Sequence, residues 1–500
     1  MIGTFWALVP PIVAIVLALI TKEAYSSLFI GILVGALFYT GFAPVATLDT
    51  ILNDGFIAAL ADSWNAGIFL FLVLLGTMVA LVNAAGGSAA FGRWAAKNIK
   101  SRGGAMIATF VLGVLIFIDD YFNCLTVGSV MRPLTDTHKI SRSKLAYLID
   151  ATAAPICMIA PISSWAAAVS ATAADLDAGI TGIELFIKAI PYNFYSLLTV
   201  VFVIALVVMK FYFGPMKLQE MNSMLGNESA ATSGGEEMEA NPKGKVIDLL
   251  FPVIVLIVTC IIGMVYVGGF WSGSDFITAF GDTDASVGLP WGAIIALVIT
   301  IIYFCCRRVL TFRQCMECLP KGFISMVPAM IILTFALTLK NITGLLGAAE
   351  YVGDLMESAS AGLASLLPAV IFIVGCALAF STGTSWGTFG ILIPIVVAMY
   401  PDTEGQMLYI GISACLAGAV CGDHCSPISD TTIMASAGAQ CDHVTHVATQ
   451  LPYAITVAAV CFVNYIIAGF VQNAWICLAI GAVLIVAVLF VIKTVTAKKA

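Results

Sequence analysis

Residues 407–437 read MLYIGISACLAGAVCGDHCSPISDTTIMASA, an apolar segment with a polar centre. A helix needs about 20 apolar residues to cross a bilayer, and this segment has that length. Two acids, Asp423 and Asp430, lie in its middle, and Pro427 lies between them. Proline interrupts helical hydrogen bonding, and an ionised carboxylate at membrane depth costs at least about 2.5 kcal/mol. The segment therefore predicts a transmembrane helix that is broken at a polar, functional point.

The same apolar character extends along the chain. Of its 500 residues, 61% are apolar and 10% are charged, whereas soluble proteins carry about 25% charged residues. This composition excludes a soluble enzyme, a disordered protein and a nucleic-acid binder, and it predicts an all-α polytopic membrane protein. The uninterrupted candidate spans are 5–21, 25–43, 66–86, 190–212, 246–268, 287–306, 322–340, 452–471 and 474–492.

The basic residues give the orientation of the spans, because cytoplasmic loops are rich in Lys and Arg. With the N-terminus outside, only Lys188 and Lys340 of the 22 Lys and Arg residues fall away from the cytoplasmic side. The opposite loops are acidic, as around Asp49, Asp282 and Asp402. We therefore expect the C-terminus to be cytoplasmic.

Other apolar stretches are interrupted by polar residues. Segment 104–131 has basic loops at both ends, and segment 361–400 has acidic loops at both ends. Each must enter and leave on one face, so both are predicted to be re-entrant helical hairpins, which occur where protein or water surrounds them. Segments 145–174 and 407–437 are predicted to cross as broken helices. The prediction is about eleven crossings with two re-entrant hairpins.

The two halves follow the same order of three spans, a hairpin, a broken span and a span, in opposite orientations. The stretch Pro161-Ile162-Ser163-Ser164 also resembles Pro427-Ile428-Ser429-Asp430. Chance similarity between apolar segments is the alternative, but matched order with opposite orientation favours inverted repeats. The predicted organisation is a first repeat at 1–217, a cytoplasmic linker at 218–245, a second repeat at 246–472, and an extra C-terminal span with a cytoplasmic tail at 473–500.

Acidic side chains at membrane depth form the candidate site. They need a counter-charge, and the spans hold almost no Lys or Arg. A bound cation or a proton is the available partner, although such acids can also cap helices or pair with hydroxyls. Carboxylates close together in a low dielectric resist joint ionisation, which suits a site that exchanges a cation for a proton. The candidate cation- or proton-binding residues are Asp119, Asp120, Asn123, Asp150, Asp423 and Asp430.

Hydroxyl-bearing residues accompany these acids at the breaks and hairpin tips. An oxygen-only shell suits Na⁺ better than a soft metal, and broken helices free backbone carbonyls for it. His424 could relay a proton or simply bond to Asp423, and the two tryptophans could hold an organic solute or serve as packing. The candidate coordinating or substrate-binding residues are Ser163, Ser164, Trp165, Thr382, Thr384, Ser385, Trp386, His424, Ser426, Ser429, Thr431 and Thr432.

A metal other than Na⁺ is not expected. Cys315 and Cys318 form a lone CxxC, and His443 and His446 lie three residues apart on one helix face. Neither pair has the further ligands that a zinc site needs. No resident cofactor is predicted.

Two motifs resemble those of a known family. Residues 422–432, GDHCSPISDTT, resemble the signature of the NhaC-type sodium/proton antiporter family, and residues 117–123, FIDDYFN, are similar to its other polar motif. The resemblance covers residues 5–472. It implies a bacterial inner-membrane secondary transporter of the ion transporter superfamily, with inverted repeats, two hairpins and often a homodimer. It also implies a mobile transport domain, and a range of solutes that includes malate, lactate and amino acids.

Two functions follow from these patterns. The first is a Na⁺/H⁺ antiporter in which Asp119, Asp120, Asp423 and Asp430 alternate between Na⁺ and H⁺. The second is a Na⁺-coupled carrier of an amino acid or an organic acid, in which the same acids bind the driving ion. A channel or a membrane-embedded enzyme is disfavoured, because no nucleophile–base pair is visible and opposed hairpins suit alternating access.

Overall fold

The computed structural model describes most of the chain, and that part is built from helices without strands. Short elements connect the long helices. They are η1 (Phe5–Leu8), α3 (Pro44–Asp49), the π-helix η2 (Thr50–Ile57), α4 (Ala58–Ala61), α6 (Gly87–Asn98), α12 (Gly182–Ala189), η3 (Ile190–Tyr192), α14 (Pro215–Leu225) and η4 (Phe270–Ser272). The described residues are 1–21, 23–117, 120–161, 163, 165–166, 169, 182–226, 241–276, 279, 283–348, 351, 365–400 and 405–497.

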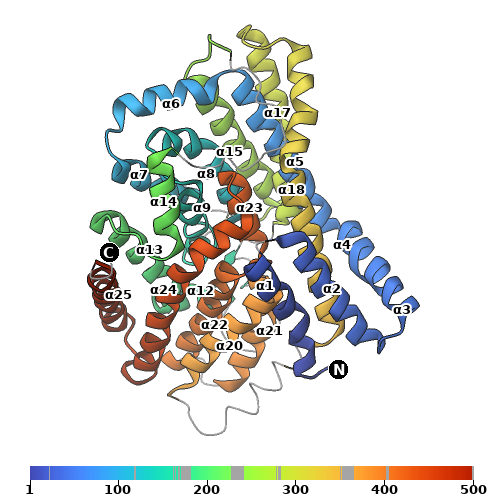
Figure 1. Ribbon diagram of the computed structural model, residues 1–500, viewed down its shortest axis with the longest axis vertical. Helices are drawn as coiled ribbons and strands as arrows, with labels where there is room; N and C mark the ends of the chain where they lie inside the picture. The colour runs from blue at the N-terminus through green and yellow to red at the C-terminus, as the bar shows by residue number, and fades with distance from the viewer. Residues whose placement is uncertain are drawn as a thin grey trace.

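A first group of helices contains the first three expected spans of each half. Its members are α1 (Val9–Thr21), α2 (Ala24–Thr40), α5 (Ser63–Ala84), α15 (Ile247–Val267), α17 (Ala285–Cys306) and α18 (Phe312–Leu345). Helix α5 packs against α17 and α18, and α15 packs against α17 (Figure 1). A Cβ atom on Gly76 of α5 would lie 2.5 Å from the carbonyl oxygen of Gly322 on α18. Small residues at such points allow membrane helices to approach closely.

A second group contains the polar motifs. Its members are α7 (Arg102–Leu115), α8 (Asp120–Thr137), α9 (Arg142–Asp150), α10 (Ala154–Cys157), α13 (Phe194–Met209), α20 (Leu367–Thr382), α21 (Ser385–Met399), α22 (Gln406–Cys425), α23 (Asp430–Ala439), α24 (His443–Val471) and α25 (Ala474–Ala497). Segments far apart in sequence meet here, because α8 and α9 of the first half both pack against α23 of the second (Figure 1). A Cβ atom on Gly128 of α8 would lie 2.5 Å from the carbonyl oxygen of Gly438 on α23.

The expected break in segment 407–437 is present between α22 and α23. Helix α22 ends at Cys425, and α23 begins at Asp430. The Ser429 side chain accepts a hydrogen bond from the backbone N–H of Thr432 at 3.3 Å and so caps α23. The Ser426 hydroxyl donates to the carbonyl oxygen of Phe380 at 2.8 Å, which ties the break to α20. The helix cap and this hydrogen bond therefore stabilise the interruption between α22 and α23.

Six of the described helices are long and apolar enough to cross a membrane, and one bent pair brings the number to seven. The pair is Glu184–Tyr192 with Phe194–Met209, bent by 45° within the span expected at 190–212. Where hairpins are expected, α7 packs against α8, and α20 packs against α21. These features agree with an all-α membrane protein, whereas the eleven crossings, the re-entrance of both helix pairs and the repeat boundaries stay predictions.

Candidate functional site

Asp423 lies on the last turn of α22 and is 2% exposed. One of its carboxylate oxygens accepts a hydrogen bond from the Ser385 hydroxyl at 2.8 Å and a longer one from the Thr431 hydroxyl at 3.4 Å. The other oxygen, Oδ1, is buried and has no hydrogen-bond partner among the described residues. A carboxylate in this position has a free lone-pair face for a cation or a proton.

Asp430 opens α23 on the other side of the same break. Its Oδ2 accepts a hydrogen bond from the Tyr121 hydroxyl at 2.5 Å, and its Oδ1 accepts one from the backbone N–H of Thr431 at 2.9 Å. Thr431 therefore touches both acids, with its hydroxyl on Asp423 and its N–H on Asp430. We call Tyr121, Ser385, Asp423, Asp430 and Thr431 the oxygen cluster, because every side-chain donor atom in it is oxygen.

The oxygen cluster joins three segments that are remote in sequence. Tyr121 is in the first turn of α8, and Ser385 is the first residue of α21. The two helix pairs expected as hairpins thus both reach the break between α22 and α23. The sequence pointed to Ser385, Thr431 and both acids, and it missed Tyr121, although this residue lies inside the polar motif 117–123.

Basic residues do not pair with these acids in the part of the chain that the structure describes. The salt bridges found there join other residues, such as Arg102 to Glu220 and Arg307 to Asp248, and none involves Asp423 or Asp430. Lys340 on α18 acts on Asp430 through space. The counter-charge that the two carboxylates need is thus only partly supplied by protein side chains.

The first polar motif has a partly structural role. Asp120 is buried at the start of α8, where its Oδ1 accepts a hydrogen bond from the backbone N–H of Tyr121 at 3.2 Å. The Asn123 side-chain NH₂ lies within hydrogen-bonding distance of the carbonyl oxygens of Gly113 at 2.7 Å, Ile116 at 2.9 Å and Thr152 at 3.0 Å. Asn123 therefore ties the end of α7 to the first broken span. Two sequence candidates, Asp119 and Ser164, lie outside the described residues.

Asp150 lies in a different environment at the end of α9. Its Oδ2 accepts hydrogen bonds from Gln450 Nε2 at 2.6 Å and from His446 Nε2 at 3.3 Å. Gln450 also donates to the backbone carbonyl oxygen of His424, and the Nδ1 atom of His424 lies 2.7 Å from the Tyr195 hydroxyl. We call Asp150, Tyr195, His424, His446 and Gln450 the histidine cluster. The sequence does not single out Tyr195, which lies in an apolar helix, or Gln450, which lies four residues after His446.

Most of the other hydroxyl candidates bind backbone groups instead of facing an acid. Ser163 donates to the carbonyl oxygens of Cys157 and Ala160 and accepts from the N–H of Ala166. Thr382 donates to the carbonyl oxygen of Leu378. The Thr384 hydroxyl accepts from Gly387, Ser426 donates to Phe380 as described above, and the buried Thr432 hydroxyl has no partner among the described residues. Ser429 is different, because its hydroxyl caps α23, lies 2.9 Å from the Thr431 hydroxyl and also interacts with the Asp423 carboxylate.

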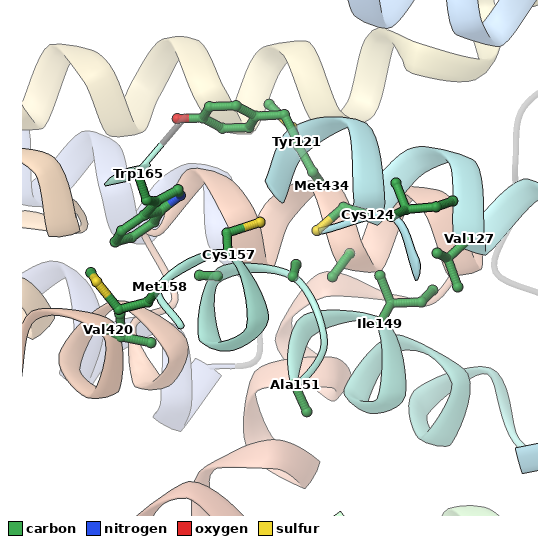
Figure 2. Packing of buried hydrophobic residues seen from close by; sticks show 14 of the residues in the cluster. Tyr121, Cys124, Val127, Ile149, Ala151, Cys157, Met158, Trp165, Val420 and Met434 are labelled. Atoms are coloured by element: carbon green, nitrogen blue, oxygen red, sulfur yellow. The ribbon is translucent and has the colours of Figure 1, made fainter. Parts of the chain in front are cut away.

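Trp165, beside the first break, and Trp386, on α21, lie side by side. The ring centroids of Trp165 and Trp386 are 5.7 Å apart, and Trp64 and Phe389 complete the contact at 6.0 Å and 6.0 Å from Trp386. We call these four residues the tryptophan cluster. The indole N–H groups of Trp165 and Trp386 are buried without a hydrogen-bond partner among the described residues. Figure 2 shows Trp165 beside Met158 and Val420 in the packed core next to the first break.

The weaker metal candidates have other roles. The Nδ1 atom of His443 lies 3.2 Å from the Ser436 hydroxyl, and its Nε2 lies 2.7 Å from the carbonyl oxygen of Pro427. His443 thereby supports the break between α22 and α23. Cys315 and Cys318 are buried free thiols. Within the described residues, no group of three or more His, Cys, Asp or Glu side chains is arranged to hold a metal ion.

Comparisons with known proteins bear on this site. A family model described as the Na⁺/H⁺ antiporter family matches residues 171–470, which include the break between α22 and α23. A protein of Haemophilus influenzae described as uncharacterized is 36% identical over 507 aligned residues, which cover 98% of this chain and 96% of that protein. The malate-2H⁺/Na⁺-lactate antiporter of Bacillus subtilis is 32% identical over 101 residues, 20% of this chain and 21% of the relative. The solved structure of Neisseria gonorrhoeae MtrF, from a class of antimetabolite efflux pumps, covers 85% of each chain with 13% identity and a TM-score of 0.34.

Proposed function

The chain belongs to the Na⁺/H⁺ antiporter family, and from this premise we propose that it exchanges Na⁺ for H⁺ at the oxygen cluster. Its family is one of transporters, and its apolar helices make it a multi-pass membrane protein. The resemblance inferred from the polar motifs is confirmed at this level. The exchange reaction, and its location at Asp423 and Asp430, are our proposal.

One observation carries the proposal: the buried Asp423 carboxylate and the partly buried Asp430 carboxylate share Thr431 across a helix break, and their side-chain hydrogen-bond partners are hydroxyl groups. Hard cations prefer carboxylate, carbonyl and hydroxyl oxygens. Two neighbouring negative charges in a low dielectric repel each other strongly, and either Na⁺ or H⁺ relieves that repulsion. Because the two ions compete for the same oxygens, binding one favours release of the other.

The positions of Ser385 and Tyr121 suit alternating access. Each is held in the first turn of a helix that belongs to an expected hairpin, and one hairpin is predicted to open to each face of the membrane. Tyr121 of one expected hairpin donates to Asp430, and Ser385 of the other donates to Asp423, so each hairpin contacts one acid of the oxygen cluster. We therefore propose that the second group of helices moves against the first, as in transporters built from inverted repeats.

The cellular setting is part of the same proposal. We place the protein in the bacterial inner membrane as a homodimer, with the N-terminus outside and the C-terminus in the cytoplasm. The transported ions would be Na⁺ and H⁺, and no resident cofactor is proposed. Its preference among Na⁺, Li⁺ and K⁺ would follow from the size of the oxygen shell, which transport assays with each ion would measure.

The test is ion exchange by the purified protein in proteoliposomes with an acidic lumen. Addition of Na⁺ outside should raise the pH of the lumen, as reported by dequenching of a pH-sensitive dye. Asp423→Asn removes the charge of one carboxylate with little change of shape and should abolish the signal. The matched control is Asp54→Asn, because Asp54 is exposed and lies far along the chain from both motifs. A wild-type protein in which Na⁺ moves no protons would refute the proposal.

A second candidate function is favoured by the tryptophan cluster. Two buried indole N–H groups without partners are costly, and an acceptor atom on a bound solute would satisfy them. The Bacillus subtilis relative is described as exchanging malate and protons for Na⁺ and lactate. The alternative is therefore a Na⁺-coupled carrier of an organic acid or amino acid, in which Trp165 and Trp386 hold the solute and the oxygen cluster holds Na⁺.

The two functions can be separated by a thermal-shift screen of metabolites with and without Na⁺. Stabilisation by a carboxylate solute only in the presence of Na⁺, and its loss in Trp165→Phe and Trp386→Phe, would favour the carrier. These changes keep an aromatic ring and remove only the indole N–H. Na⁺-driven proton movement that is unchanged in both variants, with no solute effect, would favour the antiporter.

A further inference from the structure

The buried acids of the second group of helices lie in two chemically different places. In the oxygen cluster, the side-chain partners of Asp423 and Asp430 are hydroxyl groups. In the histidine cluster, the side-chain partners of Asp150 are nitrogen atoms, Gln450 Nε2 and His446 Nε2, and they converge on the same carboxylate oxygen. The sequence had grouped all of these acids as candidates for one kind of role.

Nitrogen donors make the Asp150 position unsuitable for Na⁺. An amide NH₂ and an imidazole N–H present hydrogen atoms to the carboxylate, whereas Na⁺ needs several oxygen lone pairs. Asp150 is 1% exposed and His446 is 0% exposed, so water does not supply those oxygens freely. The position instead places the Asp150 carboxylate next to the basic imidazole ring of His446. Aspartate and imidazole that share a hydrogen bond can gain or lose one proton without a change in their contacts.

An unused atom supports a role in proton exchange. The Nδ1 atom of His446 is buried and has no hydrogen-bond partner among the described residues. A histidine that served only to orient Asp150 would be expected to have both ring nitrogens satisfied. The Nδ1 atom of His446 can therefore bind and release a proton.

The pair lies within electrostatic reach of the oxygen cluster. The charge of Asp150 acts on Asp423, which is the last acid of α22. Gln450 donates to Asp150 and to the backbone of His424, the residue that follows Asp423. The other titratable side chains that act on Asp150 or His446 are Tyr147 on the same helix, His424 and Cys425 on α22, and His443 on α24.

We propose that Asp150 and His446 hold a second exchangeable proton, in addition to the one that competes with Na⁺ at the oxygen cluster, and that Na⁺ binding at the oxygen cluster favours release of this second proton. This inference rests on the proposed function. In the proton-loaded state the imidazolium of His446 faces the Asp150 carboxylate, and the pair has no net charge. Na⁺ adds positive charge near Asp423, the imidazolium loses one proton to water and becomes neutral imidazole, and the pair is left with one negative charge. Na⁺ uptake and proton release are thus coupled through charge.

The experiment compares two transport modes of the full-length protein in proteoliposomes. Exchange of ²²Na⁺ for Na⁺ at equal pH on both sides needs only the cation site. Na⁺-driven movement of the second proton needs the Asp150–His446 pair as well. Asp150→Asn keeps the shape of the side chain, and it should retain Na⁺/Na⁺ exchange while the number of protons moved per Na⁺ falls by about half. Asp423→Asn should lose both modes.

A second substitution and a conservative replacement guard against a merely structural effect. His446→Gln keeps a hydrogen-bond donor for Asp150 without a titratable ring, so it should show the pattern expected of Asp150→Asn. It therefore tests the inference even if the Asp150→Asn variant fails to fold. Asp150→Glu, which restores the acid, should recover part of the proton movement. Loss of both modes in a folded His446→Gln variant, or an unchanged number of protons moved per Na⁺, would overturn the inference. Absence of Na⁺-driven proton movement in the wild type would instead overturn the proposed function.

Discussion

The two polar breaks of the chain are capped alike and differ in charge. In the second break, the Ser429 side chain accepts a hydrogen bond from the N–H three residues later, at 3.3 Å. In the first break, Ser163 does the same with the N–H of Ala166 at 3.1 Å. The residue after Ser429 is Asp430, and the residue after Ser163 is Ser164. The shared Pro-Ile-Ser sequence therefore supplies the helix cap in both halves, and the next position determines which break carries an acid.

The difference places both acids of the oxygen cluster in the second half of the chain. The oxygen cluster takes both acids from the second break and only the Tyr121 hydroxyl from the first half. The first half supplies Asp150 instead, where His446 and Gln450 replace the hydroxyl partners. The predicted inverted repeats, with divergent side chains, would allow one half to bind the cation and the other to contribute a proton acceptor.

The strongest way to test this comparison is to make the second break resemble the first. Asp430→Ser gives the second break the same Pro-Ile-Ser-Ser sequence as the first and leaves the Ser429 cap in place. We expect Na⁺-driven proton movement to fall by at least about 100-fold, because the carboxylate that pairs with Asp423 is gone. The dye assay in proteoliposomes measures this, and thermal unfolding checks that the fold is retained.

Asp430→Asn is the matched control, since it removes the charge and keeps the size. Similar losses in both variants would assign the effect to the missing charge. Full activity in a folded Asp430→Ser variant would show that the two breaks are equivalent, and the oxygen cluster would then not be the cation site.

The breaks and their acids could be predicted from the sequence because they are local. Proline, a capping serine and an aspartate within four residues predict a helix end and a buried charge. The partners could not be predicted in the same way. Tyr121 reaches Asp430 across 309 positions of sequence, and Gln450 reaches Asp150 across 300. Such pairs depend on how helices pack, and a tyrosine or glutamine inside an apolar helix gives no local signal.

Asn123 shows a second limit of reasoning from residue type. Its amide suggested a cation ligand, but its NH₂ faces the carbonyl oxygens of Gly113, Ile116 and Thr152. Carbonyls at the ends of helices need donors when they are buried, and the amide satisfies that need. The sequence indicates that a polar residue is required at position 123. Only the structure shows that the side-chain NH₂ group of Asn123 makes these contacts.

A smaller effect is expected from the contact that Tyr121 of the first half makes with Asp430. Tyr121→Phe removes the hydroxyl that donates to Asp430 at 2.5 Å and keeps the ring. A hydrogen bond to a charged group contributes about 1.5–3 kcal/mol. If the hydroxyl also faces bound Na⁺, the half-saturating Na⁺ concentration should rise by about tenfold. Initial rates at increasing Na⁺ measure it.

Tyr192→Phe is the control for loss of a buried tyrosine hydroxyl, because the Tyr192 hydroxyl bonds Gln406 and Gln472 away from the oxygen cluster. It should leave the Na⁺ dependence unchanged. An unchanged Na⁺ dependence in Tyr121→Phe itself would mean that the Tyr121 hydroxyl is not a Na⁺ ligand. The side-chain ligands of the oxygen cluster would then all come from the second half of the chain.

The smallest expected effects come from a pair of serines whose roles differ. Ser385 donates to Asp423, whereas Ser163 bonds only backbone groups. Ser385→Ala should weaken the apparent affinity for Na⁺ by about threefold to tenfold, since a ligand oxygen is lost while its helix cap, Thr384, remains. Ser163→Ala should lower the free energy of unfolding by about 1 kcal/mol, as loss of a cap does, with the Na⁺ affinity unchanged. Transport at varied Na⁺ and thermal unfolding, run on both variants, separate a ligand from a cap, and the reverse result would show that the first break, too, faces the ion.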